Sequence, residues 1–400
     1  MFSRSLRRIG VALFAVLALA VNQAVAAPPF ETTARNAILI DVDSGMVLYE
    51  KNADDRIHPA SMSKLMTAYV VFEQLASGAL KLTDTIPVSV DIWRKWRRLD
   101  GSTMFLNAGD RPTVEQLLLG VIVQSGNDAC DVFATAIGGT EESFADYLNQ
   151  KAKEIGLRDS HFTNASGWPD PDHVMTVRDI ATVAERIIRD FPQYYHFYSV
   201  REFTYAGVRQ RNRNPLLGVM DGADGLKTGY TAEAGYGVAV SAVRDGQRLI
   251  GVVAGLPSSR ERAREAERLL SHGFRNFKSY KLFDKGQMIE EAAVWLGEHD
   301  RVPLMVADDV KITIERSARQ NMKAKLVYDS PISAPIKEGQ RVGTVVVTIP
   351  GRDDVEVPVV AGATIEEITG FGRIGAAFKQ LLWGTGRSVT DSLEPAADSK

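Results

Sequence analysis

One segment, residues 64–75, constrains the fold of this chain more than any other. Its apolar side chains cover most of the circumference of a helix: Leu65, Met66, Tyr69, Val70, Phe72 and Leu75. A helix of this kind is predicted to be buried. Yet Ser61 and Lys64, at positions i and i+3, share one face at its start. Serine is a favoured N-cap and lysine can extend its amine to solvent, so a purely structural role is one interpretation of the pair.

The first 26 residues have the pattern of a secretory signal peptide and are excluded from the fold. Basic residues precede an apolar run, residues 11–21, and Ala24-Val25-Ala26 forms a small-residue cleavage site. An uncleaved membrane anchor is the alternative, but the apolar run is short for a membrane-spanning helix. The sequence therefore predicts an exported protein.

Composition narrows the functional class. The 400 residues carry a formal net charge of −3, with 47 basic and 50 acidic side chains, so nucleic acid is not an expected partner. Cys130 is the single cysteine, which excludes an intramolecular disulfide. It could be a nucleophile, but no histidine lies nearby in the sequence, and a buried small side chain is the simpler interpretation. The six histidines lack the spacing of metal ligands, so neither a metal nor another cofactor is expected.

Strands flank a helical middle up to residue 284. Residues 36–52 predict two strands around a turn, and β-branched runs on both sides of Asp245-Gly246 predict a hairpin. Helices are predicted between these strands and after the hairpin, over residues 113–124, 143–156, 176–191 and 258–274. Together these elements predict one α/β domain over residues 27–284.

The pattern after residue 284 is that of strands alone. Turn residues recur about every 8–12 positions, which predicts a small β-sandwich over residues 285–369, acting as a spacer or platform. Residues 370–386 predict an aromatic-rich amphipathic helix, which would lie on a membrane surface or pack on the β-domain. Residues 387–400 are predicted to be a disordered tail.

The serine–lysine pair has a chemical interpretation if the chain supplies partner groups. A hydroxyl nucleophile needs a positioned base, and lysine can serve if desolvation or neighbouring cations lower its pKa. At a turn after an apolar helix, Ser125 could relay a proton to a leaving amine, and Asn127 could hydrogen-bond Lys64 or a substrate carbonyl. Lys227-Thr228-Gly229 begins a strand that could pair with an extended substrate, which the glycine lets approach closely. Each motif alone also fits an ordinary turn.

In combination the motifs are specific. Ser-x-x-Lys, Ser-x-Asn and Lys-Thr-Gly occur in the order shared by penicillin-binding proteins and serine β-lactamases. Four longer segments, residues 37–71, 101–129, 161–184 and 224–242, resemble the low-molecular-mass D-alanyl-D-alanine carboxypeptidases. The resemblance extends from about Ala37 to the end of the chain.

The resemblance implies the fold of that family. This is an α/β (α+β) domain of the serine β-lactamase/DD-peptidase type, with an antiparallel sheet and a helical subdomain, followed by a small all-β sandwich domain and a C-terminal amphipathic helix. It also implies that residues 370–386 attach the protein to a membrane surface. A periplasmic protein attached peripherally to the inner membrane is therefore expected.

The resemblance further implies a serine acyltransferase mechanism on peptidoglycan stem pentapeptides, with β-lactam antibiotics as inhibitors. Ser61, deprotonated by Lys64, would attack the carbonyl of the penultimate D-alanine, and Ser125 would relay a proton. After the terminal D-alanine leaves, water would hydrolyse the acyl-enzyme. The backbone N–H groups of Ser61 and Tyr230 would form the oxyanion hole. The implied substrate-binding residues are Asn127, Lys227, Thr228, Gly229, Tyr230 and Arg262.

The assignments of Arg262 and Tyr230 are less direct than the others. Arg262 is chosen from a run that also contains Arg260 and Arg264, as the residue that would help to hold the terminal carboxylate. Tyr230 stands where some family members have histidine directly after Lys-Thr-Gly, which leaves open how fast the acyl-enzyme is hydrolysed.

Three other functions are compatible with a protein of this type: serine β-lactamase, non-catalytic wall-binding protein and DD-endopeptidase. A serine β-lactamase of the commonest kind needs Glu-x-x-Leu-Asn between the second and third motifs, and no glutamate in that interval begins this pattern. A non-catalytic wall-binding protein would be expected to have a broken motif, whereas all three are intact. A DD-endopeptidase, which would cut cross-links with the same residues, remains open.

Overall fold

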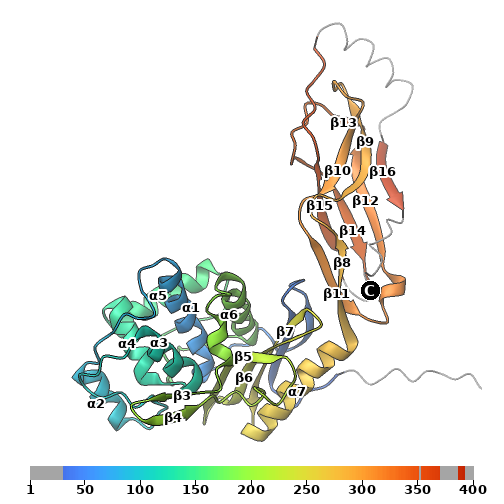
Figure 1. Ribbon diagram of the computed structural model, residues 1–400. Coiled ribbons are helices and arrows are strands. Elements are labelled where there is room, and N and C mark those ends of the chain that lie inside the picture. Colours follow the sequence, from blue (N-terminus) through green and yellow to red (C-terminus); the bar gives the residue numbers. More distant parts are fainter. Residues whose placement is uncertain (1–29, 351–352, 370–385, 392–400) are drawn as a thin grey trace, which may run out of the picture. The chain divides into compact units, whose positions relative to one another are not determined.

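The computed structural model describes residues 30–350, 353–369 and 386–391 (Figure 1). The predicted signal peptide lies outside the described residues. So does the predicted amphipathic helix, except for its last residue, Gly386. Within the described part of the chain, no helix is both long and apolar enough to span a membrane.

A five-stranded antiparallel sheet forms the centre of the first domain. Its strand order is β2-β1-β7-β6-β5. The bounds are β1 (Asn36–Asp41), β2 (Val47–Lys51), β5 (Ala223–Thr231), β6 (Gly235–Arg244) and β7 (Gln247–Leu256). Asp245 and Gly246, between β6 and β7, both have positive φ, as a tight hairpin turn requires. The predicted strands and hairpin are confirmed, and β5 lies at one edge of the sheet.

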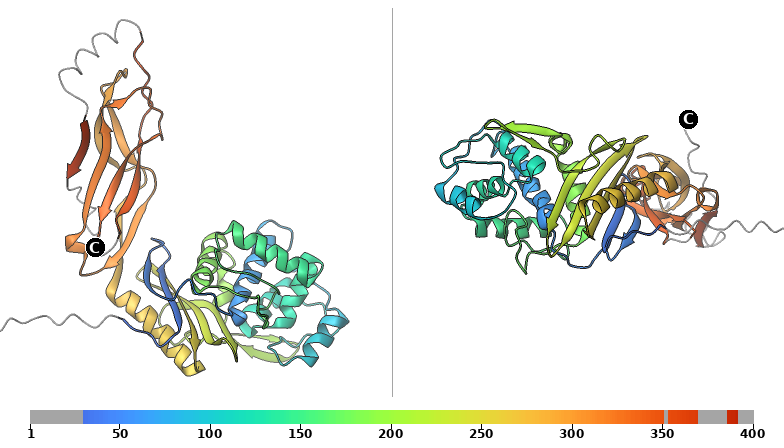
Figure 2. Two further views of the ribbon diagram at one scale, coloured as in Figure 1. Left: turned by 180° about the vertical axis from the view of Figure 1, so that it is seen from behind. Right: turned by 90° about the horizontal axis from the view of Figure 1, so that it is seen from below.

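Helices cover both faces of this sheet (Figure 2). α7 packs against β6 and β7, and α6 packs against β1 and β7 from the side of the helical group. Threonine or serine side chains cap the starts of α3, α5, α6 and α7. The bounds are α1 (Lys64–Ala76), α2 (Val90–Arg98), α3 (Val114–Leu119), α4 (Asn127–Gly138), α5 (Glu141–Glu154), α6 (Val177–Asp190) and α7 (Ser259–Asn276).

Helix α1 is buried, as predicted. It packs against α4, α5 and α6, and every residue from Lys64 to Phe72 is buried. Because α1 is fixed on several sides, the backbone at its start has little freedom to move. That start carries the serine–lysine pair.

The second domain is built from strands, as predicted. Its seven-stranded sheet has the order β13-β9-β10-β15-β14-β12-β16, and β8 pairs separately with β11. The bounds are β8 (Phe277–Phe283), β9 (Met288–Trp295), β10 (Arg301–Val306), β11 (Val310–Glu315), β12 (Lys323–Ser330), β13 (Ile332–Ser333), β14 (Arg341–Thr348), β15 (Val355–Ala361) and β16 (Gly386–Asp391). Leu282 and Phe283 of β8 belong to the core of this domain. The β-domain therefore begins at β8, before the predicted boundary at residue 285.

The C-terminal tail differs from the prediction. Residues 387–391 were expected to be disordered, but they belong to β16, which pairs antiparallel with β12 from Lys325↔Asp391 to Ser330↔Gly386. The physical reason is that an edge strand offers backbone N–H and C=O groups to any extended segment within reach. A short polar segment does not reveal such a partner in the sequence.

Candidate active site

Ser61 and Lys64 are in direct contact at the entrance to α1. Ser61 lies in a single 3-10 turn, η1 (Ala60–Ser63), and Lys64 is the first residue of α1. The Lys64 Nζ donates hydrogen bonds to Ser61 Oγ at 2.9 Å, Asn127 Oδ1 at 2.7 Å and the Ser166 carbonyl oxygen at 2.6 Å. Neither η1 nor α1 has a side-chain capping bond. The N-cap interpretation of the pair is therefore wrong.

The surroundings of Lys64 favour loss of its proton. Its side chain is almost entirely inaccessible, with 1% exposed. Burial, together with the positive charge of Arg213, lowers the pKa of Lys64 to about 8, against the opposing effect of Cys130, Asp131 and Asp128. Compared with an ordinary lysine, this increases the neutral fraction at neutral pH by roughly two orders of magnitude. Lys64 can therefore act as a base toward the Ser61 hydroxyl.

A strained turn presents Ser125 to the same place. The five-residue π-helix η2 (Gly120–Gln124) ends at Ser125, whose φ of 66° is in the left-handed region. The next residue's N–H donates to the Gly120 carbonyl at 2.8 Å, and the Asn127 N–H donates to the Ser102 carbonyl at 2.7 Å. These backbone bonds hold the turn, from which Asn127 reaches Lys64 while Ser125 lines the same cavity as Ser61. Strain of this kind is typical of functional sites.

Strand β5 supplies the opposite wall. The Lys227 Nζ donates to Ser125 Oγ at 2.9 Å and to the Thr228 carbonyl at 3.1 Å. Burial lowers the pKa of Lys227, and the nearby charges of Lys64 and Arg213 add to this effect. Gly229 is required by close packing, because a Cβ there would lie 2.7 Å from the Pro59 carbonyl oxygen. The glycine lets β5 approach the turn that carries the serine.

These groups surround a cavity of about 900 Å³. Seven of the nine predicted site residues line it: Ser61, Ser125, Asn127, Thr228, Gly229, Tyr230 and Arg262. The other two, Lys64 and Lys227, are buried beneath it and reach it through their bonds to the two serines. Arg260 and Arg264 do not line the cavity, and Arg264 pairs with Glu261 at 2.7 Å. The structure thus brings all nine predicted residues together and distinguishes Arg262 from its neighbours.

Sequence reasoning missed Arg213. It lies in the loop before β5, lines the cavity, and its Nη1 donates to Ser102 Oγ at 2.6 Å. Its positive charge lowers the pKa of both buried lysines, and burial lowers its own pKa. No motif in the sequence indicates such a role, because a charged residue in a loop is ordinarily solvated.

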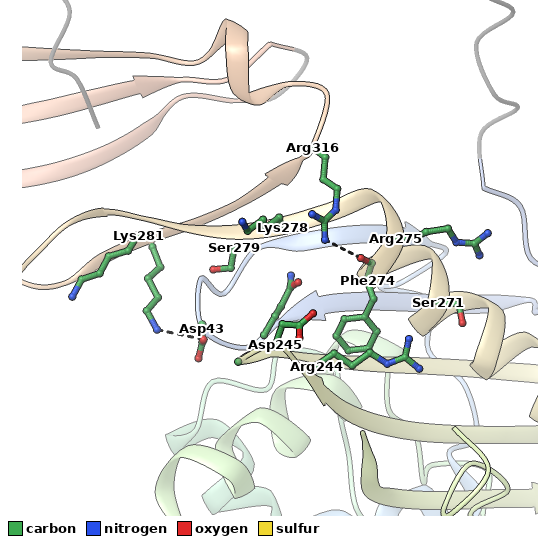
Figure 3. A pocket seen from close by; sticks show the side chains of 13 residues that line it. Asp43, Arg244, Asp245, Ser271, Phe274, Arg275, Lys278, Ser279, Lys281 and Arg316 are labelled. Atoms are coloured by element: carbon green, nitrogen blue, oxygen red, sulfur yellow. Dashed lines mark hydrogen bonds and ion pairs between the residues drawn. The ribbon is translucent and has the colours of Figure 1, made fainter. Parts of the chain in front are cut away.

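Two other candidate features carry no comparable chemistry. Cys130 is completely buried, and burial raises the pKa of its thiol to about 12, which confirms that it is a small core side chain. A second cavity of about 850 Å³ lies beside the β6–β7 turn and the end of α7 (Figure 3). Arg244, Arg275 and Lys278 line it, but none of the predicted site residues does. Among the described residues, no cluster of His, Cys, Asp and Glu could hold a metal ion.

The fold and the site together indicate a class of protein: a serine hydrolase of the penicillin-binding type, with a buried lysine hydrogen-bonded to the candidate nucleophile. The family model described as D-alanyl-D-alanine carboxypeptidase matches residues 21–258. The model described as Penicillin-binding protein 5, C-terminal domain, matches residues 277–367.

Individual relatives agree with these matches. D-alanyl-D-alanine carboxypeptidase DacC of Escherichia coli (strain K12) is 40% identical over 366 residues, which cover 90% of this chain and 91% of the relative. The structure of penicillin binding protein 5 from Haemophilus influenzae is similar with a TM-score of 0.81 and 36% identity, covering 85% of this chain and 100% of that chain. Penicillin-Binding Protein D2 from Listeria monocytogenes, in the ampicillin-bound form, is similar with a TM-score of 0.56 and 30% identity, covering 62% of this chain and 100% of that chain.

The chain therefore belongs to the D-alanyl-D-alanine carboxypeptidase family. It is a serine-type hydrolase with the activity that the family is named for, and it carries the β-domain of penicillin-binding protein 5. These findings confirm the predicted family, the enzyme class and the fold class of the two domains; the predicted C-terminal helix lies outside the described residues except for Gly386. They favour the carboxypeptidase over the serine β-lactamase and the wall-binding protein that the sequence left as alternatives.

Proposed function

We propose that this enzyme removes the terminal D-alanine from peptidoglycan stem pentapeptides through an acyl-enzyme on Ser61. The observation that carries the proposal is the bond from the buried Lys64 amine to Ser61 Oγ, at 2.9 Å. The neutral amine takes the hydroxyl proton while Oγ bonds to the carbonyl carbon of the penultimate D-alanine. The carbon–nitrogen bond then breaks and releases D-alanine. Water afterwards hydrolyses the ester and restores the serine.

The proton held by Lys64 has to reach the leaving amine. Ser125 is the proposed relay, because its Oγ is hydrogen-bonded to Lys227 and lies on the same cavity wall as Asn127. Asn127 keeps the Lys64 amine in place by accepting its hydrogen bond through Oδ1 at 2.7 Å. In this scheme the two buried lysines have different tasks: Lys64 accepts the proton, and Lys227 orients the relay.

The edge of β5 is the proposed binding site for the peptide backbone of the substrate. An extended peptide can add alongside this edge strand and pair with its backbone. We place the carbonyl oxygen between the backbone N–H groups of Ser61 and Tyr230. Removal of one such donor typically costs about 3–4 kcal/mol of transition-state stabilisation.

The terminal carboxylate is proposed to bind at the cationic end of the cavity. Thr228 offers a hydroxyl and Arg262 a guanidinium at the surface of the cavity, above Lys227. Charge-assisted hydrogen bonds are the strongest kind available for this contact. Arg213 joins this set, because it lines the same cavity. Penicillins also carry a carboxylate, which supports the proposal that they acylate Ser61.

The proposed location rests on two segments, residues 1–26 and 370–386, which lie outside the described residues except for Gly386. We propose that residues 1–26 direct export to the periplasm. Residues 370–386 would then attach the enzyme to the surface of the inner membrane. The β-domain would act as a spacer or platform.

Intact-mass spectrometry with benzylpenicillin tests the chemistry directly. The expected result is an adduct of one drug mass that maps to Ser61 and is absent from Ser61→Ala. Release of D-alanine from a stem pentapeptide then establishes the reaction. Rapid drug turnover without a lasting adduct would favour a β-lactamase. The absence of both an adduct and drug turnover would overturn the proposal.

A further inference from the structure

Three side chains form a continuous stack on the wall of the active-site cavity. Tyr230 of β5 and Tyr236 of β6 are directly paired across the two strands, and their ring centroids are 4.1 Å apart with a 30° angle between the planes. The guanidinium carbon of Arg262 lies 5.6 Å from the centroid of the Tyr236 ring. All three residues line the cavity.

Arg262 is held differently from Arg264 and Arg268, which lie on the same helix, α7. Arg264 pairs with Glu261, and Arg268 pairs with Glu265. Among the described residues, Arg262 forms no ion pair, and its buried Nε has no hydrogen-bond partner. The contact with the Tyr236 ring is therefore its principal restraint within the described part of the chain.

This difference has a functional consequence. A carboxylate partner would also fix a flexible arginine, but it would occupy the donors and neutralise the charge that an anionic ligand needs. An aromatic face attracts the guanidinium without using its in-plane N–H donors. The donors then remain available for the ligand. Tyr230, 52% exposed at the mouth of the cavity, supports the Tyr236 ring by stacking on it.

We propose that Tyr236 is a positioning residue, whose ring, supported by Tyr230, orients the Arg262 guanidinium to receive the carboxylate of the terminal D-alanine. This inference rests on the proposed function. It assigns to the tyrosine pair the preference of the enzyme for a free C-terminal carboxylate. Only the ring of Tyr236 is needed, since the contact does not involve its hydroxyl.

The test compares two substrates in the full mature protein: diacetyl-L-lysyl-D-alanyl-D-alanine and the same tripeptide with a C-terminal amide. Tyr236→Leu keeps apolar bulk but removes the aromatic face, and we expect it to raise KM for the acid about tenfold with little change in kcat. Its effect on the amide should be small. Tyr236→Phe should behave as the wild type. Arg264→Ala, on the same helix but outside the cavity, is the matched control for α7.

A double-mutant cycle separates positioning from independent binding. If Tyr236 acts through Arg262, Tyr236→Leu combined with Arg262→Ala should be no worse on the acid than Arg262→Ala alone. Additive losses, or equal losses on acid and amide, would overturn the inference. If the wild type released no D-alanine from the acid peptide, the proposed function itself would fail. Thermal melting of each variant checks that the domain is folded.

Discussion

We expect the pH dependence of acylation to depend on the charge of Arg213, which lies outside the three sequence motifs. In the proposed mechanism Ser61 is acylated only when Lys64 is neutral, and burial together with the positive charge of Arg213 lowers the pKa of Lys64 to about 8. The deprotonated form is the reactive one, so the acylation rate rises with pH. Well below the pKa the rate should increase about tenfold per pH unit and then level off near pH 8.

Arg213→Met removes the charge and keeps a side chain of similar length. Without this charge the Lys64 ammonium is less disfavoured, so the pKa of Lys64 rises. The ascending limb of the plot of acylation rate against pH then moves to higher pH. For two charges in a partly buried site, a shift of about 0.5–1 pH unit is a reasonable magnitude, which lowers the rate at pH 6.5 about three- to tenfold beyond any effect on binding.

The assay is the second-order rate constant for acylation by benzylpenicillin, measured by intact mass from pH 5.5 to 9.5. The position of the ascending limb, and not the maximal rate, is the diagnostic quantity, because Arg213 also belongs to the proposed carboxylate site. Arg211→Met, which removes an exposed arginine at the end of β4 (Val208–Arg211), is the control and should leave the limb in place. An unchanged limb in Arg213→Met, or a flat profile in the wild type, would refute the reasoning.

Three further predictions concern the base, the packing of β5 and the membrane. Lys64→Arg keeps the charge but cannot readily lose a proton, so acylation should fall by at least about a thousandfold while the melting temperature shows that the domain remains folded; retained activity would exclude Lys64 as the base. Gly229→Ala brings a Cβ to 2.7 Å from the Pro59 carbonyl and should slow acylation about a hundredfold by displacing β5, which the same mass assay would measure, whereas an unchanged rate would show that the close contact is not needed. Phe371→Glu with Phe378→Glu should abolish flotation of the full mature chain with anionic liposomes without changing benzylpenicillin acylation, and flotation that persists would exclude residues 370–386 as the anchor.

The parts of the site that the sequence predicts are those with a local chemical signature. Ser61 and Lys64 are one helical turn apart, so their contact follows from spacing alone. Ser125 and Lys227 are 102 residues apart, and their 2.9 Å bond could be expected only from the order of three motifs and a family resemblance. The resemblance therefore supplied the long-range half of the site.

The residues that escaped prediction act through their position in the folded structure. Arg213 and Tyr236 lie in sequence without a motif. Arg213 acts through its charge on the buried lysines and Tyr236 through its contact with Arg262, and both depend on the assembly of β5, β6 and α7. Strand β16 is similar, because its pairing depends on the edge of β12. A single sequence contains no record of such neighbours, whereas apolar periodicity correctly predicted the burial of α1.

The cations of the cavity have two tasks that are physically linked. Arg213 and Arg262 line it, Lys64 and Lys227 lie beneath it, and Asp100 is the one acidic side chain among the described residues of its lining. The positive charge of Arg213 attracts a substrate carboxylate and at the same time disfavours a proton on Lys64. The bound carboxylate weakens the second effect, so the base is most readily neutral before the substrate arrives. Loss of the Arg213 charge should therefore change both the KM for acidic peptides and the pH dependence of acylation, whereas loss of a residue that only lines the cavity should change the KM alone.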